Sequence, residues 1–228
     1  MLKMYDLAGA DESNRFSPYC WRVRMALAHK SLECEFIPWR FTEKDRIAFS
    51  GQGQVPVLVD GETAVCDSWK IALYLESRYP QNPLFGCEAA KGQALFVKHW
   101  VERTLHPLLV RIAVRDVWER LHEKDKAYFR ESREKRFGMP LEQVPKDREQ
   151  LAAGFRTALD PVRATLEDQP YLCGNSPGFA DYMVFSVLQW GRCASRFPLL
   201  EETDAIFAYR ERMLDLFDGA ARRVPAAA

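Results

Sequence analysis

The sequence predicts a small α/β domain followed by an all-helical domain. Hydrophobic periodicity changes repeatedly within residues 1–80, where short alternating runs are interleaved with helical patterns. Residues 81–90 are rich in turn-forming residues, and the apolar patterns after them have helical spacing. We therefore expect one domain at 1–80, a linker at 81–90 and a second domain at 91–228.

The first domain is expected to follow the order β-α-β, an irregular stretch with room for a short helix, and then β-β-α. The expected strands span 2–7, 33–39, 54–59 and 63–66, and the expected helices span 18–29 and 68–79. Asp60-Gly61 lies between the last two apolar runs, and this dipeptide is a strong hairpin signal. Pro80 ends the second helix, because proline cannot continue it.

The rest of the chain is expected to be helical. A long apolar pattern runs from Ala94 to Ile112. Residues 119–136 are densely charged and predict a solvated helix followed by a loop. Further helices are expected at 146–168, 179–194 and 203–216, and the tail GAARRVPAAA is expected to be frayed.

Charge and hydropathy argue against several function classes. The chain has 32 basic and 32 acidic residues, so its formal net charge is 0, which argues against nucleic-acid binding. No apolar run approaches the roughly 18 residues that a membrane-spanning helix needs. Residues 1–8 are too short and too polar for a signal peptide. We therefore expect a cytoplasmic protein with no membrane partner.

The cysteines and histidines indicate no metal site. None of the six cysteines forms a Cys-x-x-Cys pair, and the four histidines are not clustered. Free thiols in a reducing compartment, most of them buried, are the expected state of the cysteines.

A first chemical motif lies where the first strand leads into the first helix. Pro18 suits the first helical position, which makes Ser17 the N-cap residue. Ser17 either caps the helix alone or also donates a hydrogen bond to a thiolate held at the positive helix end. Cys20, one turn further on, is expected to be buried and unreactive.

Two further motifs follow at the sheet and at the second helix. Pro56 cannot donate to a sheet ladder, so it marks either an edge position or a cis peptide after Val55. A cis peptide would leave the Val55 backbone free to pair with an extended peptide. Asp67 and Ser68 begin the second helix, where they either cap it or bind a carboxylate.

These motifs carry a resemblance to a known family. Ser17-Pro18-Tyr19-Cys20 resembles the Cys-Pro-Tyr-Cys motif of glutaredoxins with serine in place of the first cysteine, which implies a thioredoxin-like first domain. With the other two motifs and the helical second domain, nearly the whole chain resembles the cytosolic glutathione transferase superfamily. The resemblance implies glutathione as co-substrate, a hydrophobic small-molecule electrophile and a homodimer.

The resemblance also implies roles for individual residues. Val55 before Pro56 binds the cysteinyl backbone of glutathione, with Gln54 beside it, and Asp67 and Ser68 bind the γ-glutamyl carboxylate. Ser17 best matches the thiol-activating serine, with Ser13 and Asn14 as alternatives. Candidates for the glycyl carboxylate are Arg40, Lys44 and Gln52. The candidate residues of the electrophile pocket are Phe16, Tyr19, Trp39, Trp100, His106, Arg111 and Arg115.

Local phrases are similar to the bacterial β-etherase branch and to the serine-type fungal transferases related to it. They are Ser-Pro-Tyr followed by Trp-Arg, and Phe179-Ala180-Asp181-Tyr182. That branch implies cleavage of an aryl ether. Asp181 itself is expected to cap its helix. Two alternatives stay open: a non-catalytic glutathione-binding or protein-interaction module, and a glutathione-dependent lyase or reductase, which would need a cysteine at position 17.

Overall fold

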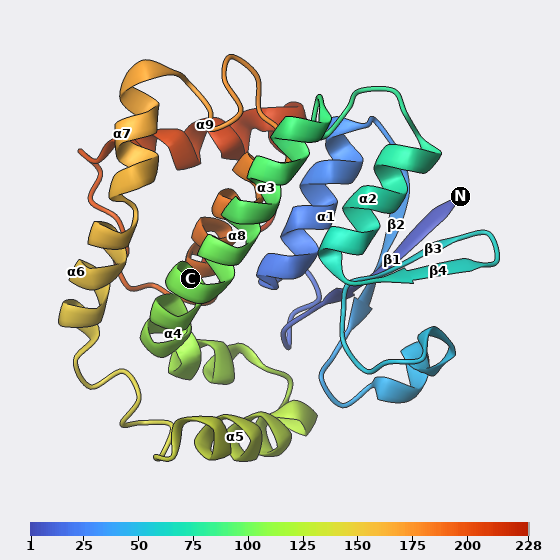
Figure 1. Ribbon diagram of the computed structural model, residues 1–228. Coiled ribbons are helices and arrows are strands. Elements are labelled where there is room, and N and C mark those ends of the chain that lie inside the picture. The colour runs from blue at the N-terminus through green and yellow to red at the C-terminus, as the bar shows by residue number, and fades with distance from the viewer. Residues whose placement is uncertain (228) are drawn as a thin grey trace.

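The first part of the chain forms a sheet with helices packed beside it (Figure 1), as seen in the computed structural model, which describes residues 1–227. Its elements are β1 (Leu2–Leu7), α1 (Pro18–His29), β2 (Cys34–Trp39), the 3₁₀ helix η1 (Lys44–Ser50), β3 (Val57–Asp60), β4 (Thr63–Cys66) and α2 (Ser68–Arg78). The expected β-α-β…β-β-α order is confirmed, and the irregular stretch does hold a short helix.

The sheet has the mixed order β2-β1-β3-β4 of a thioredoxin-like domain. β1 runs parallel to β2 and antiparallel to β3, and β3 and β4 form the predicted hairpin around Gly61. Gly61 has a φ of 60°, which a glycine adopts without strain. Both α1 and α2 lie on the side of the sheet that is turned toward the helical part (Figure 1).

The second part is helical, as predicted. It contains α3 (Glu88–Trp100), the π-helical turn η2 (Val101–Leu105), α4 (His106–Arg120), α5 (Glu123–Phe137), α6 (Arg148–Ala158), α7 (Asp160–Asp168), α8 (Phe179–Ala194) and α9 (Ala205–Gly219). α3, η2 and α4 follow one another without a loop, so this stretch is longer than predicted. The helix expected at 146–168 is divided at Leu159, because Pro161 follows and cannot donate to the preceding turn.

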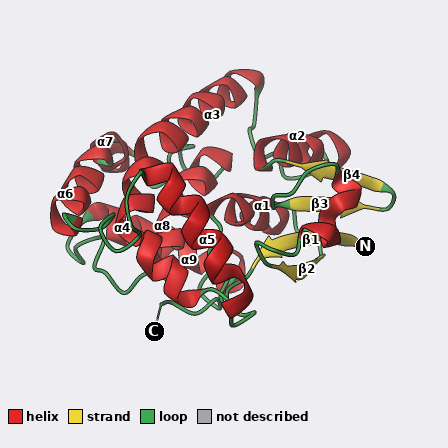
Figure 2. Ribbon diagram, turned by 90° about the horizontal axis from the view of Figure 1, so that it is seen from below, coloured by secondary structure: helices red, strands yellow, loops and turns green. Residues whose placement is uncertain are grey.

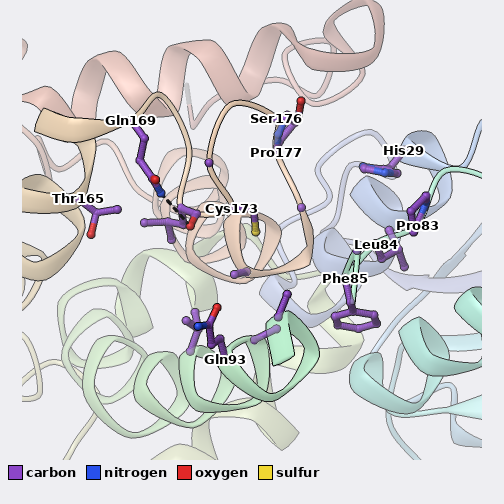
Figure 3. A pocket seen from close by; sticks show the side chains of 18 of the residues that line it. His29, Pro83, Leu84, Phe85, Gln93, Thr165, Gln169, Cys173, Ser176 and Pro177 are labelled. Carbon is purple, nitrogen blue, oxygen red and sulfur yellow. Dashed lines mark hydrogen bonds between the residues drawn. The ribbon is translucent and has the colours of Figure 1, made fainter. Parts of the chain in front are cut away.

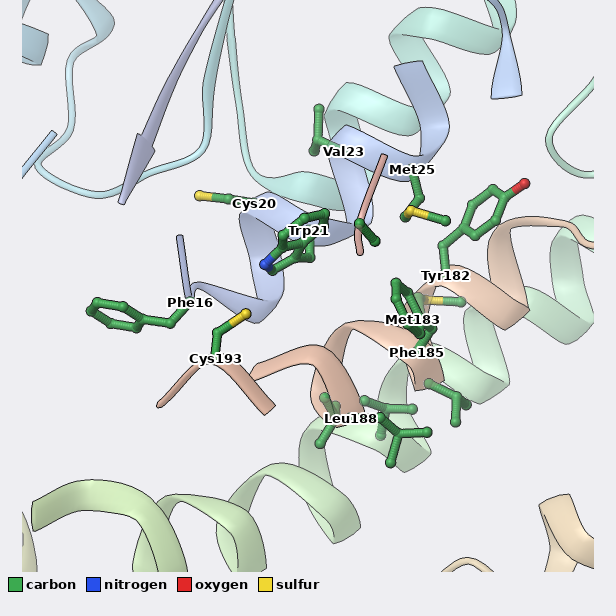
Figure 4. Close-up of a cluster of buried hydrophobic side chains, with 14 of the residues drawn as sticks. Phe16, Cys20, Trp21, Val23, Met25, Tyr182, Met183, Phe185, Leu188 and Cys193 are labelled. Atoms are coloured by element: carbon green, nitrogen blue, oxygen red, sulfur yellow. The ribbon is translucent and has the colours of Figure 1, made fainter. Parts of the chain in front are cut away.

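The core between the two parts is built on α1 and α8 (Figures 2 and 4). α1 packs against both α2 and α8, and its buried Trp21 and Met25 lie near Met183 and Phe185 of α8. Nearly every residue of α8 is buried. This helix pair therefore fixes how the helical part sits on the sheet domain.

Asp181 secures the start of α8 and is structural, as expected. Its fully buried carboxylate accepts hydrogen bonds from the backbone N–H groups of Leu172 (2.7 Å), Cys173 (3.2 Å) and Gly178 (3.0 Å) and from the Tyr209 hydroxyl (3.0 Å). One side chain thus joins α8, the preceding loop and α9.

The tail is docked, so the expectation of a frayed end is wrong for the described residues. Ala221 and Val224 are buried. Gln189 donates its amide N–H to the Ala221 carbonyl (3.0 Å), and Arg192 donates to the Val224 carbonyl (2.8 Å). Polar side chains of α8 thus hold the tail, an arrangement that the tail's own composition does not indicate. Ala228 lies outside the described residues.

The six cysteines are free, but only Cys20 and Cys193 are buried, so the expectation of mostly buried thiols is wrong. Cys87 and Cys173 are exposed because they lie in surface loops. Within residues 1–227, no group of three or more potential metal-binding side chains is found. Over the same range, no helix has the length and apolar character needed to cross a bilayer.

Candidate functional site

Three loops meet at one end of the sheet because of the strand register. Tyr5 near the end of β1 pairs with Val57 at the start of β3, which in turn pairs with Cys66 at the end of β4. The loop entering α1, the loop before β3 and the start of α2 therefore leave the sheet side by side. All three motifs singled out in the sequence lie at this edge.

Ser17 is the N-cap of α1, with Pro18 in the first turn, as predicted. Its Oγ accepts a hydrogen bond from the backbone N–H of Cys20 at 3.3 Å, and the residue is only 5% exposed. Cys20 is fully buried, and this burial raises the pKa of its thiol well above the ordinary value. The prediction that Cys20 is buried is confirmed, and its thiol is not available as a nucleophile.

The two alternatives to Ser17 lie in different surroundings. Asn14 is buried and donates its side-chain N–H to the backbone carbonyl of Cys193, 3.1 Å away in the helical part. Ser13 is exposed, and its backbone N–H donates to the Asp11 carboxylate (2.8 Å). Asn14 thus joins the two parts of the molecule.

The peptide bond between Val55 and Pro56 is cis. The strand expected at 54–59 begins only at Val57, because Pro56 has no N–H for the ladder. Val55 is half-buried and precedes the ladder, so its backbone takes no part in the strand pairs.

Asp67, not Ser68, is the N-cap of α2. Asp67 has a φ of 74°, and its Oδ1 accepts the backbone N–H groups of Trp69 (3.1 Å) and Lys70 (3.0 Å). Ser68 is the first helical residue and is buried. Its Oγ has no hydrogen-bond partner among residues 1–227. A buried hydroxyl at the positive end of a helix is suited to a carboxylate ligand.

The residues predicted to bind the glycyl carboxylate differ in how many contacts their side chains make with the rest of the protein. Arg40 donates to the carbonyls of Gly9 and Ala10 and pairs with Glu12 (3.2 Å), so it holds the loop before α1. Its role at the glycyl carboxylate stays a prediction. The exposed Lys44 lies with its ammonium group 4.8 Å from the ring centroid of Tyr128 on α5.

Gln52 and Gln54 form a local loop. The backbone N–H of Gln54 donates to Gln52 Oε1 (2.6 Å), and the Gln52 amide donates back to the Gln54 carbonyl. Gln54 is exposed beside Val55, whereas Gln52 is partly buried.

Several residues predicted for the electrophile pocket are either buried in the core or exposed on α4. Phe16 and Trp39 are each 2% exposed, because both pack in the hydrophobic core. Arg111 and Arg115 are exposed on α4, where Arg115 pairs with Glu119 (3.1 Å). The assignments of Phe16 and Trp39 are corrected, because apolar spacing identified packing positions there. The pocket role of Arg111 and Arg115 stays a prediction.

Trp100 lines a different cavity, of about 1400 Å³, which contains none of the three motifs (Figure 3). Its walls are the loop from Asn82 to Gly86, α3, α7 and the loop before α8, with Gln93 and Cys173 on opposite sides. This cavity is predominantly apolar. Its position excludes it as the place where the three motifs act together.

Tyr19 and His106, two of the residues predicted for the electrophile pocket, lie against each other between the two parts. The Tyr19 hydroxyl lies 3.2 Å from His106 Nδ1, with the rings edge-on at 5.1 Å. Burial, reinforced by the charge of Arg22, lowers the pKa of His106 to about 3. Burial also raises the pKa of the Tyr19 phenol. Both side chains are therefore neutral near pH 7.

A buried ion pair lies beside Tyr19 and His106, and the sequence analysis did not predict it. Arg22, only 1% exposed, donates from Nη1 to Glu102 Oε1 at 2.8 Å, and Lys98 pairs with the other oxygen (2.7 Å). Glu102 lies in the π-helical turn η2. Such turns often mark functional sites, but hydrophobic periodicity does not reveal them.

α5 lies at the bottom of the view in Figure 1, below α4. Its fully buried Asp125 accepts hydrogen bonds from the backbone N–H groups of Phe41 (3.1 Å) and Thr42 (3.0 Å) and from the Thr42 hydroxyl (2.7 Å). Arg133 stacks over Phe129 and Phe41. The charged helix predicted at 119–136 is therefore confirmed, but it is anchored to the sheet domain.

Comparisons with known proteins agree with this arrangement. Residues 13–83 match the family model "Glutathione S-transferase, N-terminal domain", and residues 93–198 match "Glutathione S-transferase, C-terminal domain". Glutathione S-transferase Z1 of Arabidopsis thaliana is 41% identical over 68 residues, which cover 28% of this chain and 31% of that protein. Glutathione S-transferase 1 of Dianthus caryophyllus is 26% identical over 206 residues, 85% of each chain. The match thus spans about a third of the length of the first relative and most of the second.

Solved structures share the fold over nearly the full chain. Glutathione transferase GSTFuA3 from Phanerochaete chrysosporium gives a TM-score of 0.78 at 22% identity, covering 98% of this chain and 94% of that one. CsGST63524 of Ceriporiopsis subvermispora, solved in complex with glutathione, gives a TM-score of 0.82 at 19% identity, covering 96% and 97%. With both domain models matched in order and the fold shared end to end, this chain belongs to the cytosolic glutathione S-transferase superfamily.

Proposed function

We propose that this protein transfers glutathione to a hydrophobic, aromatic electrophile. One observation carries the proposal: the start of α1, the cis Val55–Pro56 loop and the start of α2 leave the same edge of the sheet. Together they supply a hydroxyl at a helix end, an unpaired backbone and a carboxylate site. These are the groups that γ-Glu-Cys-Gly needs, and CsGST63524, whose fold this chain shares, was solved with glutathione.

Ser17 is the proposed activator of the glutathione thiol. Its oxygen already accepts the Cys20 N–H, and a hydroxyl that accepts in this way still has its own proton to donate. Donation to the sulfur favours the thiolate, and the positive end of α1 acts in the same direction. A thiolate at neutral pH is the nucleophile that the reaction requires.

The rest of the tripeptide is assigned to the other two loops. The backbone of Val55 pairs with the cysteinyl residue, and the buried Oγ and N–H of Ser68 bind the γ-glutamyl carboxylate, with Asp67 beside them. Gln54 and Lys44, which are both exposed, are the candidates for the glycyl end.

The finer assignment is aryl ether cleavage by a cytoplasmic homodimer. It is supported by the likeness of the Ser-Pro-Tyr and Phe-Ala-Asp-Tyr phrases to the β-etherase branch, and by six free cysteines, which suit a reducing compartment. A reductase is disfavoured, because position 17 is serine and Cys20 is buried.

Calorimetry with reduced glutathione and a conjugation assay with 1-chloro-2,4-dinitrobenzene test the proposal. We expect both binding and turnover. Ser17→Ala should lower kcat by about 10²-fold or more while glutathione still binds, and Ser13→Ala is the matched control. A normal rate in Ser17→Ala would transfer the role to Ser13 or Asn14.

A second candidate is a non-catalytic glutathione-binding module, which the low exposure of Ser17 favours. Binding without conjugation of any electrophile would support that module. Absence of glutathione binding by the folded protein would refute both the transferase function and the glutathione-binding module.

A further inference from the structure

Tyr19 lies between α1 and the helical part. It belongs to the first turn of α1, two residues beyond Ser17, and it is 37% exposed. Its hydroxyl lies 3.2 Å from Nδ1 of His106, the first residue of α4. Tyr19 thus follows the proposed thiol activator closely in the chain and contacts the helical part.

The surroundings of His106 determine which ring nitrogen carries the proton. Nδ1 faces the Tyr19 oxygen, whereas Nε2 is buried and has no hydrogen-bond partner among residues 1–227. A buried N–H without an acceptor costs more than a buried lone pair without a donor. The proton therefore resides on Nδ1.

This tautomer sets the direction of the hydrogen bond to Tyr19. With the proton on Nδ1, His106 donates to the Tyr19 oxygen. The hydroxyl proton of Tyr19 is then free to point into the site. A hydrogen bond that the phenol accepts stabilises its anion, and so it offsets part of the rise in pKa that burial causes.

Arg22 adds to this stabilisation from beneath the ring. Its guanidinium carbon lies 4.8 Å from the Tyr19 ring centroid, and its Nε and Nη2 are buried with no partner in the described chain. Glu102 takes up only Nη1. A positive charge with unused donors favours a transient phenolate on Tyr19.

We propose that Tyr19, oriented by His106, is a catalytic residue that donates its proton to the oxygen leaving group of an aryl ether, an inference that rests on the proposed function. The glutathione thiolate attacks the carbon bound to the ether oxygen, so that a C–S bond forms and the C–O bond breaks. The electron pair of that bond remains on the phenolic oxygen, which takes the Tyr19 proton. Tyr19 regains a proton from water, which had received the thiol proton. The products are a thioether and a phenol.

The test uses a series of alkyl aryl ethers that differ only in the phenol released. For Tyr19→Phe we expect kcat to fall by about 10²-fold or more with the least acidic phenol. With a nitrophenol we expect about a twofold change, since that anion leaves without a proton. Conjugation of 1-chloro-2,4-dinitrobenzene, which releases chloride, should also change by about twofold, and the Kd of glutathione should be unchanged.

His106 is a positioning residue, and its variants separate orientation from packing. His106→Asn keeps an N–H donor near Tyr19 and should retain most of the activity toward the least acidic phenol. His106→Leu should show the same leaving-group dependence as Tyr19→Phe. A purely structural role would slow all substrates alike in both variants.

Three further outcomes would contradict the proton-donor role of Tyr19 or the proposed function. An equal loss across the ether series in Tyr19→Phe overturns the proton-donor role. A wild-type protein that conjugates 1-chloro-2,4-dinitrobenzene but cleaves none of the ethers overturns the inference and leaves glutathione transfer standing. A wild-type protein that neither binds glutathione nor conjugates any electrophile overturns both proposals.

Discussion

Two serines stand at the two helix ends of the site, and they have different partners. Ser17 caps α1 by accepting the Cys20 N–H. Ser68 does not cap α2, because Asp67, with a φ of 74°, is the N-cap residue. The sequence shows the pair Asp67-Ser68, but the φ angle of Asp67 decides which of the two residues caps α2. Ser68 thereby keeps a buried hydroxyl for a ligand.

At the same scale, His106 should make stability depend on pH. Its native pKa is about 3, held down by burial and by Arg22, whereas an unfolded histidine has a pKa of about 6.5. Between these values the unfolded chain binds a proton that the native state does not. The free energy of unfolding therefore falls as pH decreases from about 6.5 toward 3, by at most about 1.4 kcal/mol per pH unit from this residue.

His106→Asn should remove that contribution. Urea unfolding at pH 7 and pH 5 should show a smaller loss of stability for the variant than for the wild type. His99→Asn, at an exposed position on α3, is the matched control. The same loss in His106→Asn and in the wild type would contradict the burial of a neutral imidazole.

At the scale of elements, α5 is anchored to the sheet domain by hydrogen bonds. Its composition predicts a solvated helix, and most of its surface is indeed polar. Yet Asp125 is fully buried and accepts two backbone N–H groups and one hydroxyl from residues 41–42. A charged residue in a charged helix gives no sequence signal of burial, so only tertiary structure distinguishes Asp125 from its neighbours.

Asp125→Ala should therefore lower the free energy of unfolding by about 2–4 kcal/mol, because it leaves buried N–H groups without an acceptor. Lys124→Ala, which removes an exposed ion pair with Glu43 (2.7 Å), should cost less than about 1 kcal/mol. Urea unfolding of both variants provides the comparison. Similar effects of the two substitutions would show that α5 is not anchored through Asp125.

At the scale of the whole molecule, α8 is a buried helix against which several other helices pack. It packs against α1, α3, α4 and α9. Asp181 joins its start to the preceding loop and to α9, and Gln189 and Arg192 hold the tail. Residues far apart in the chain thus depend on a single buried helix.

Removal of residues 220–228 should reduce the free energy of unfolding by about 1–3 kcal/mol. The truncation deprives the buried Gln189 amide of its acceptor and exposes apolar surface that Ala221 and Val224 cover. A shorter truncation, of residues 225–228, keeps these contacts and should cost less. Thermal or urea unfolding gives the comparison, and a long truncation with wild-type stability would mean that the tail contributes nothing.

The sequence by itself determined the two-part architecture, the strand and helix order, the hairpin at Asp60-Gly61 and the three motifs at the sheet edge. These features follow from local periodicity, turn chemistry and proline geometry, which neighbouring residues dictate. Tertiary structure alone decided that Phe16 and Trp39 are core residues, that Arg40 ties down a loop, and that the tail docks on α8. It also brought Tyr19 to His106 and buried Arg22 beside Glu102. Such pairings join residues some eighty positions apart, and their energy depends on the packing around them, which no local pattern encodes.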